Sequence, residues 1–465
     1  MKKVIIFVLV IALALGGIVF AHAAVTASQD DLTIYPTLEL GDRSTVEGLT
    51  ASMVFTCGDH LSWQTDYAFT GETSSSFSYH WNITDNDPVY PSNRFEFQLD
   101  SGVSGGGDLL LSQSPYKDLF RFVADQTPAG GETSMEVNLA DYADFYLPSY
   151  EIIYWSDQGF CDQASDLWGT LGGYEVSGFR LGIYDGLNRS FRFPIQEDQL
   201  AEVGITRDPT GNIDGFDFYL RDHPLIYFVT AMNDQGVWFL PVFRTETGEP
   251  LPYESPSGHG IYFMPWVTDS SRNSTYKGKP VSGLSPNMAK LTQVVSLPED
   301  LTIVEASIDG VEATILTLED GAYILTVYDL ATGGSRRLEV LPFDGGKPLY
   351  GYVMKGGDYL LVTAQGHLAL VEKDTMTLLL TAPDVTGQTC SAISYSPDLG
   401  TLRFEDGILT LSAAVPTYQD GTFWIAAWRQ GELLYYGEYD CSLMRGNDRF
   451  YYGLIAAQRV MLESK

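Results

Sequence analysis

The chain has 465 residues and a formal net charge of −33, from 60 acidic and 27 basic side chains. A surface of this charge repels phosphate backbones and anionic lipid headgroups, so nucleic acid is excluded as a partner. The length is enough for one large β domain or for two or three domains of average size, each with its own core.

The chain begins with a segment typical of exported proteins. Lys2 and Lys3 precede an unbroken apolar run over residues 4–20, and small residues follow. This order predicts a secretory signal peptide that is cleaved after Ala23. The run is also nearly long enough to span a bilayer, so a retained membrane anchor is the alternative.

Residues 1–24 are therefore predicted to be a signal peptide or an N-terminal membrane anchor. Under both alternatives the two lysines hold the N-terminus in the cytoplasm. Residues 25–465 are then an extracytoplasmic domain, which is either secreted or anchored to the membrane by residues 4–24. We expect contact with the membrane only through this segment.

The cysteines and histidines form no recognisable metal-binding pattern. The four cysteines, which are far apart, are Cys57, Cys161, Cys390 and Cys441. Their spacing is not that of a zinc ligand set, and three disulfide pairings stay open. The six histidines include no H-x-H or H-x-x-x-H pair, so we expect no histidine-based metal centre.

From Leu32 onward, short runs of Val, Ile, Leu, Tyr, Phe and Trp alternate with clusters of Gly, Asp, Asn and Pro. This pattern predicts an all-β fold. Few windows keep helical periodicity for more than two turns, and the better helix candidates are residues 162–171 and 196–203.

A repeated pattern is clearest over residues 223–465. Each copy starts at a glycine, continues as an apolar or aromatic strand and has a charged residue eight positions later. The copies are GVWFLPVFR (236–244), GAYILTVYD (321–329), GHLALVEKD (366–374) and GTFWIAAWR (421–429). The pattern predicts a hairpin turn at the glycine, a strand buried on both faces, and a polar turn into an outer strand.

Four-stranded units that recur every ~40–50 residues are typical of β-propeller blades, because each sheet buries its faces against neighbouring sheets. The segment VYDLATGG (327–334) resembles the turn between the third and fourth strands of WD40-like and quinoprotein-like propeller repeats. The resemblance covers this blade well and the others loosely. It implies an all-β β-propeller. About 435 residues at ~50 per blade would then allow seven or eight four-stranded blades. Residues 448–462 would add a strand to the first blade and close the ring; tandem β-sandwiches are the alternative.

The segment RDPTGNIDGFD (207–217) carries several acidic and amide oxygens. It lacks the glycine and glutamate positions of an EF-hand, but a looser calcium loop could use Asp208, Asn212 and Asp214. The alternative, which we favour, is a hairpin whose turn is made by Pro, Gly and Asn. Calcium is the cofactor that this segment would bind if it were a site.

No catalytic motif lies in the sequence context that its chemistry needs. GVSGG (102–106) matches the pattern around a nucleophilic serine, but predicted strands flank it on both sides where a helix should follow. The loop-flanked aromatics Tyr262 and Trp266 are the best candidates for a ligand-binding surface. We therefore predict a non-catalytic propeller that binds a ligand, glycan or protein at the cell surface. The alternative is an extracytoplasmic polysaccharide hydrolase that uses paired carboxylates.

Overall fold

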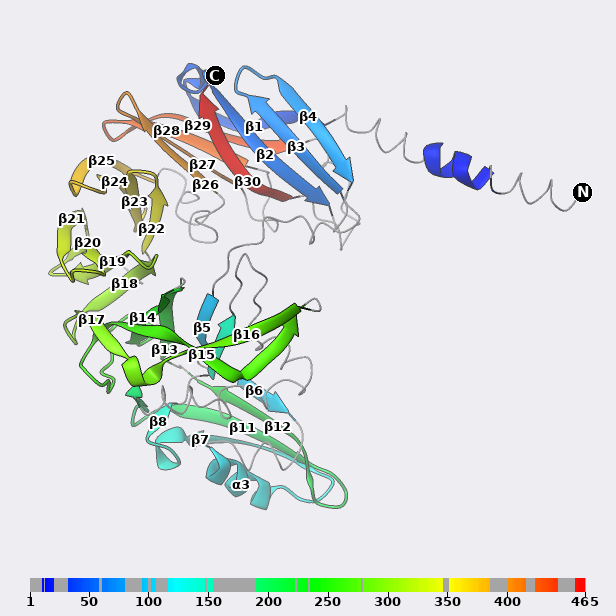
Figure 1. The fold of residues 1–465 in the computed structure, drawn as a ribbon, viewed down its shortest axis with the longest axis vertical. Coiled ribbons are helices and arrows are strands. Elements are labelled where there is room, and N and C mark those ends of the chain that lie inside the picture. Colours follow the sequence, from blue (N-terminus) through cyan, green and yellow to red (C-terminus); the bar gives the residue numbers. More distant parts are fainter. Residues whose placement is uncertain are drawn as a thin grey trace, which may run out of the picture. The chain divides into compact units, whose positions relative to one another are not determined.

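The computed structural model describes part of the chain and is almost entirely β-sheet (Figure 1). The all-β prediction is confirmed. The described residues are 11, 13–20, 32–57, 61–79, 94–98, 102–105, 116–146, 149–153, 190–221, 224–232, 235–276, 279–345, 351–384, 400–414, 423–441 and 456–464.

Most of the predicted export segment lies outside the described residues. Residues 13–20, which are described, are helical. Within the described ranges, no helix is both long and apolar enough to cross a membrane. The choice between a signal peptide and an anchor stays a prediction.

The chain forms two compact units. The first unit combines Met1–Pro88 with Gly351–Lys465, and the second unit is Val89–Tyr350.

The first unit contains three antiparallel sheets of the predicted blade type. One has the order β30 (Ala456–Ser464), β2 (Leu49–Cys57), β3 (Leu61–Ala68) and β4 (Thr73–Tyr79). The next consists of β22 (Gly351–Gly356), β23 (Tyr359–Ala364), β24 (His367–Glu372) and β25 (Thr377–Pro383). The third consists of β26 (Gly400–Glu405), β27 (Ile408–Ala414), β28 (Phe423–Arg429) and β29 (Glu432–Cys441), with β1 (Ile34–Gly41) as a fifth strand on β29.

The C-terminal strand completes the sheet formed by the N-terminal strands, as predicted. β30 pairs antiparallel with β2, with Val460 opposite Met53, and the two strands lie side by side in Figure 1. The strand begins at Ala456, somewhat later than the predicted segment 448–462. Thr401 also donates a hydrogen bond of 2.6 Å from its Oγ1 to the carbonyl of Val460. The two ends of the chain thus share one sheet.

The central strands of these sheets are buried on both faces, as the repeat pattern predicts. In β28, Phe423 and Ile425 pack into a core shared with β1–β3 and β30. The intervening Trp424 and Trp428 pack into a second core shared with β22–β25. Because side chains alternate across a strand, one strand supplies two cores. This arrangement explains why the segment is continuously apolar.

In the second unit, one four-stranded sheet is a simple meander and two sheets are more complex. The meander is β18 (Thr302–Ile308), β19 (Glu312–Glu319), β20 (Ala322–Asp329) and β21 (Ser335–Pro342). A second sheet has the order β6 (Gly102–Gly105), β12 (Ile213–Leu220), β11 (Leu200–Arg207) and β7 (Glu132–Asn138). The largest has the order β16 (Lys279–Pro286), β15 (Gly260–Tyr276), β14 (Gly236–Arg244), β13 (Leu225–Met232), β5 (Arg94–Gln98) and β9 (Ser149–Ile153), with β17 (Thr292–Ser296) on β15. The short β8 (Phe145–Tyr146) pairs with β10 (Phe193–Pro194).

One helix of the second unit packs on β11. Helix α3 (Lys117–Gln126) buries Leu119, Phe120, Val123 and Ala124 on its inner face. Sequence periodicity did not predict this helix. Of the two predicted helices, residues 162–171 lie outside the described residues, and residues 196–203 overlap β11 and are not helical. That prediction is wrong because β11 alternates buried Ala201, Val203 and Ile205 with more exposed residues, which is a strand pattern.

The turns that start the repeats have the predicted backbone. Asp320 and Gly321 have φ of 48° and 80°, and Gln365 and Gly366 have φ of 47° and 74°. Two successive positive φ values define the tight hairpin turn that matches strand twist. The turn after β20 is also confirmed, since the Asp329 carboxylate accepts 2.9 Å hydrogen bonds from the backbone amides at positions 331 and 332.

Candidate functional site

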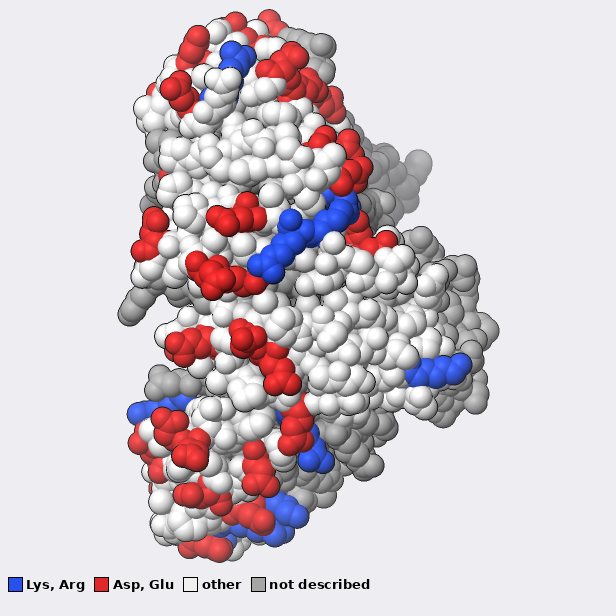
Figure 2. All heavy atoms as spheres, turned by 90° about the vertical axis from the view of Figure 1, so that its left-hand side faces the viewer, with Lys and Arg blue, Asp and Glu red and all other residues white. Residues whose placement is uncertain are grey.

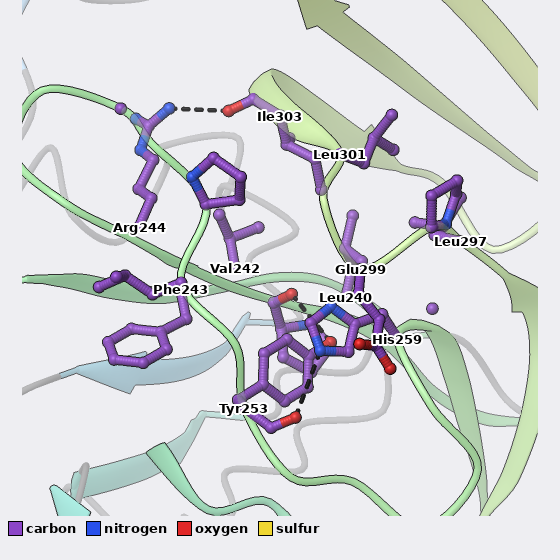
Figure 3. Close-up of a pocket in the computed structure, with 16 residues that line it drawn as sticks. Leu240, Val242, Phe243, Arg244, Tyr253, His259, Leu297, Glu299, Leu301 and Ile303 are labelled. Carbon is purple, nitrogen blue, oxygen red and sulfur yellow. Dashed lines mark hydrogen bonds between the residues drawn. The ribbon is translucent and has the colours of Figure 1, made fainter. Parts of the chain in front are cut away.

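The second unit contains a small cleft between the end of β14 and the start of β18 (Figure 3). Its cavity volume is about 30 Å³, which is room for a few small atoms or about two water molecules. Its apolar walls include Leu240, Val242, Leu251, Leu297, Leu301 and Ile303. The polar side chains on its lining are Arg244, Tyr253, His259 and Glu299.

Arg244 is held at one end of the cleft by backbone oxygens. Its Nη1 donates to the carbonyls of Ile303, at 2.8 Å, and Val304, at 3.5 Å. Its Cζ also lies 5.4 Å from the ring centroid of Tyr227, a cation–π contact. Its Nε is buried and has no hydrogen-bond partner among the described residues. The guanidinium is therefore oriented by neutral groups.

The sequence accounts for the position of Arg244 and of the β18 carbonyls that it contacts. Arg244 is the last residue of β14, the charged position that ends the first repeat. On β18 the register with β19 shifts between Ile303 and Glu305. Such a bulge takes backbone groups out of the regular ladder, and the Ile303 and Val304 carbonyls here accept from Arg244.

Glu305 lies on β18, two residues after Ile303, and the charge of Arg244 acts on its carboxyl. Burial raises its pKa from 4.5 to about 7, against the opposing effects of a backbone hydrogen bond at Ala306 and of the Arg244 charge. Burial also raises the pKa of Tyr227. The positive charge of Arg244 opposes this increase, and the negative charge of Glu305 adds to it. Arg244, Glu305 and Tyr227 are thus one electrostatically linked group, which we call the Arg244 cluster.

The pKa of Glu305 leads to a stability prediction. Because its folded-state pKa lies above its unfolded value, its contribution to stability is complete below about pH 4.5 and is lost as the pH rises through about 7. Replacing Glu305→Gln should therefore raise the free energy of unfolding at pH 8 by about 2 to 3 kcal/mol and leave it nearly unchanged at pH 4.5. Urea unfolding at both pH values measures the difference. Equal effects at the two pH values would contradict the assignment.

The other end of the cleft is a neutral, stacked pair. The rings of Tyr253 and His259 are 3.9 Å apart at 17°, and Figure 3 shows them together. His259 Nε2 lies 3.2 Å from the Tyr253 carbonyl, so Nε2 carries the proton in this contact. Burial lowers the pKa of His259, which favours its uncharged form.

The predicted aromatic surface site needs correction. Tyr262 is fully buried, stacks on Phe239 and donates from its hydroxyl to the Gly258 carbonyl. It lies on β15 inside the core shared with α3, so it cannot meet a ligand at the surface. Trp266, further along β15, is partly buried and packs against the same core. The sequence indicated a loop-flanked aromatic cluster at the surface, but β15 runs through both residues as a strand with one face inward.

The segment proposed as a calcium loop forms the hairpin between β11 and β12. One carboxylate oxygen of Asp208 accepts hydrogen bonds from the backbone amides of Thr210, at 2.8 Å, and Asn212, at 2.9 Å, and from the Thr210 hydroxyl at 2.7 Å. These bonds, led by that of the Thr210 side chain, lower the pKa of Asp208. Asp214 is exposed on β12. Among the described residues, no group of three or more His, Cys, Asp or Glu side chains is placed to hold a metal ion.

The predicted serine pattern falls on a strand. β6 (Gly102–Gly105) pairs with β12, with Ser104 opposite Asp217. This is an edge-strand position, whereas a nucleophile elbow needs a strand-to-helix turn.

The Arg244 cluster was missed by sequence reasoning, although signals for it are present. The repeat pattern marks Arg244 as a charged residue after a buried strand, and Glu305 interrupts the apolar segment TIVEASI. Neither signal indicates that the two residues, on separate sheets, are neighbours. Figure 2 shows many acidic and fewer basic side chains over one face of the molecule, in agreement with the net charge of −33.

Comparisons with known proteins do not assign a family. No family model matches the chain, and no curated relative matches it. Solved structures of WD40 and other propeller-like proteins are similar to it at low TM-scores. The WD40 domain of SCAP from fission yeast has a TM-score of 0.20 and 9% identity, over 52% of each chain, so the match spans about half of that chain.

Two further structures match over more of this chain. A D477G ACO/RPE65 chimera has a TM-score of 0.25 and 9% identity, over 93% of this chain and 96% of that chain. A prolyl endopeptidase has a TM-score of 0.22 and 11% identity, over 84% of this chain and 48% of that chain. Likenesses of this strength say nothing about ligand or activity.

Proposed function

We propose that this chain is an exported, blade-built β protein that binds a ligand through the cleft beside Arg244 and does not catalyse its conversion. The observation that carries the proposal is the cleft itself, which combines apolar walls with one guanidinium held in place by backbone carbonyls. Binding sites are typically concave and apolar with a few fixed polar groups that set orientation.

The electrostatics of the cleft support binding. The hydrogen-bond acceptors of Arg244 Nη1 are neutral carbonyls, and Glu305 is only partly ionised at neutral pH because its pKa is about 7. The positive charge is therefore incompletely compensated. A cavity of about 30 Å³ admits only one small group of a ligand, so a negative end group is the part of the ligand that would enter the cleft.

A hydrolase is the second candidate, and one observation favours it. A partly buried carboxyl with a pKa of about 7, such as that of Glu305, has the property of a general acid. However, hydrolysis of a glycoside needs a second carboxylate facing the first. The charged group that acts on Glu305 is Arg244, and those that act on Tyr227 are Arg244 and Glu305. This composition favours binding over hydrolysis.

The location outside the cytoplasm is part of the proposal and depends on Lys2, Lys3 and the apolar run at residues 4–20. N-terminal sequencing of the full-length product recovered from a fractionated bacterial host tests it. An N-terminus after Ala23, or an intact N-terminus in the membrane fraction, agrees with export. Recovery of the intact chain in the cytoplasmic fraction contradicts it.

A blocking substitution tests whether the cleft is the binding site. Leu301 lies on the cleft wall just before β18 and is partly exposed, so Leu301→Trp should fill the cavity. We expect some members of a panel of soluble wall-glycan fragments and short peptides with free C-terminal carboxylates to raise the unfolding midpoint of the full-length chain. Leu301→Trp should abolish those shifts.

The matched control is Leu200→Trp, which changes a partly exposed leucine on β11 that does not line the cleft. It should keep every shift. Both variants should unfold within a few degrees of the parent without ligand. Shifts that survive in Leu301→Trp, or a panel without any shift, would overturn the cleft as the binding site.

A further inference from the structure

The guanidinium of Arg244 closes one end of the cleft. Arg244 on β14 and Ile303 on β18 both line the cleft, and the 2.8 Å hydrogen bond from Arg244 Nη1 to the Ile303 carbonyl joins the two walls (Figure 3). Nη1 also lies 3.5 Å from the Val304 carbonyl, and the ring centroid of Tyr227 lies 5.4 Å from Cζ. These contacts hold a cation where the walls meet.

This cation keeps an unused hydrogen-bond donor. An arginine side chain has five N–H donors, and within the described part of the chain the acceptors of Arg244 are the two carbonyls on Nη1. Its Nε is buried and has no hydrogen-bond partner among the described residues. Because a buried donor without an acceptor is unfavourable, an anion beside the guanidinium would compensate the charge and accept from this donor.

The size of the cleft restricts this anion to a very small one. A cavity of about 30 Å³ holds about two water molecules, and a halide ion is only slightly larger than one water molecule. Sulfate, phosphate and organic acids are too large to enter whole. The apolar walls, which include Leu240, Val242 and Leu297, favour a weakly hydrated ion, because its transfer out of water costs less than that of a strongly hydrated ion.

We infer that the cleft binds one halide ion, chloride or bromide, beside the Arg244 guanidinium, and that this ion competes with the negative end group of the organic ligand. The inference deepens the proposed function, and its second part rests on that function. It names an inorganic anion for the same site and a regulation of ligand binding by halide concentration. No covalent bond changes and no proton is transferred.

Two carboxylates limit the affinity for the ion. Glu299 lines the cleft and is exposed, and the charge of Arg244 acts on the carboxyl of Glu305. Both carboxylates compete with the ion for one positive charge, so the dissociation constant is expected to be on the order of 10 to 100 mM.

Thermal unfolding of the full-length chain in different salts tests the ion in solution. Replacing about 300 mM gluconate by bromide at constant ionic strength should raise the unfolding midpoint by about 2 to 6 °C, relative to Arg244→Gln in the same salts. This comparison removes the general effects of the two salts on stability. Leu301→Trp, which keeps Arg244 and fills the cavity, should lose the same increment.

The matched control is Arg221→Gln, which removes an exposed arginine that pairs with Glu136 and Glu202 and does not line the cleft. It should keep the bromide increment of the parent. An increment that persists in Arg244→Gln or Leu301→Trp would overturn the ion site.

Anomalous scattering locates the ion. A crystal of the full-length chain soaked in sodium bromide should show a bromide peak in the cleft beside Arg244, and an Arg244→Gln crystal should show none there. A peak in the cleft without the midpoint increment in solution would mean an adventitious ion only, and would overturn the inference. Peaks only outside the cleft would overturn it as well.

Competition connects the ion to the proposed ligand. Raising chloride from about 10 to about 500 mM at constant ionic strength should weaken the apparent affinity for a glycan or peptide that binds in the cleft by roughly 5- to 25-fold. If Leu301→Trp abolishes the glycan or peptide shifts but chloride leaves them unchanged, the cleft is the ligand site and the halide inference is wrong. If bromide binds beside Arg244 but no panel member shifts the midpoint, the ion site stands and the proposed ligand function fails.

Discussion

Deletion of residues 456–465 should destabilise the first unit by more than about 5 kcal/mol, the largest effect expected for a change in this chain. β30 buries Val460 and Leu462, and its backbone fills one edge of β2. Each buried aliphatic side chain contributes about 1.5 to 3 kcal/mol, and the lost ladder hydrogen bonds add to this. The deletion also exposes a long strand edge, which favours aggregation.

Differential scanning calorimetry of the full-length chain and the deletion variant measures this effect. A loss of 5 kcal/mol corresponds to a fall of roughly 10 to 20 °C in the unfolding midpoint of a unit of this size. Amide exchange of β2 (Leu49–Cys57) should accelerate in the deletion variant. The control is deletion of Lys465 alone, which lies beyond β30. An unchanged midpoint and protected β2 amides after the longer deletion would contradict the pairing.

Trp424→Ala should lower the free energy of unfolding by about 3 to 5 kcal/mol, as for other buried aromatic residues. Trp424 is 1% exposed near the start of β28 and packs into the core shared with β22–β25. Its neighbours Phe423 and Ile425 face the opposite core. The cavity would therefore open on one side of a strand that is fixed on the other side, which limits collapse around it.

Urea unfolding checks this magnitude. Trp424→Phe retains most of the buried area and should lose less than half as much stability, while Val54→Ala on the partly exposed face of β2 should change it little. A loss below about 1 kcal/mol for Trp424→Ala would show that β28 is not packed on both faces.

Features encoded by neighbouring residues could be predicted from the sequence. The glycines at positions 321 and 366 follow residues that also tolerate positive φ, so the hairpin turns are local. The continuous apolar runs in β20, β24 and β28 directly reflect burial on two faces. The C-terminal strand was predictable because an unpaired sheet edge needs a partner.

Features that depend on distant pairing could not be predicted in the same way. Tyr262 has the composition of a surface aromatic, and only its place in β15, opposite Phe239, buries it. Helix α3 needed knowledge of the sheet that it covers. Arg244 and Ile303 are 59 positions apart in the sequence and meet because a bulge in β18 presents its carbonyls to β14. Neither residue alone marks a site.

The most direct test of the binding cleft is a crystal of the full-length chain soaked in the member of the glycan and peptide panel that raises the unfolding midpoint most. We expect ligand density at the cleft lined by Leu301 and Ile303, with one end group of the ligand inside it. Ligand density only elsewhere, or an empty cleft at a concentration that raises the midpoint, would contradict the account.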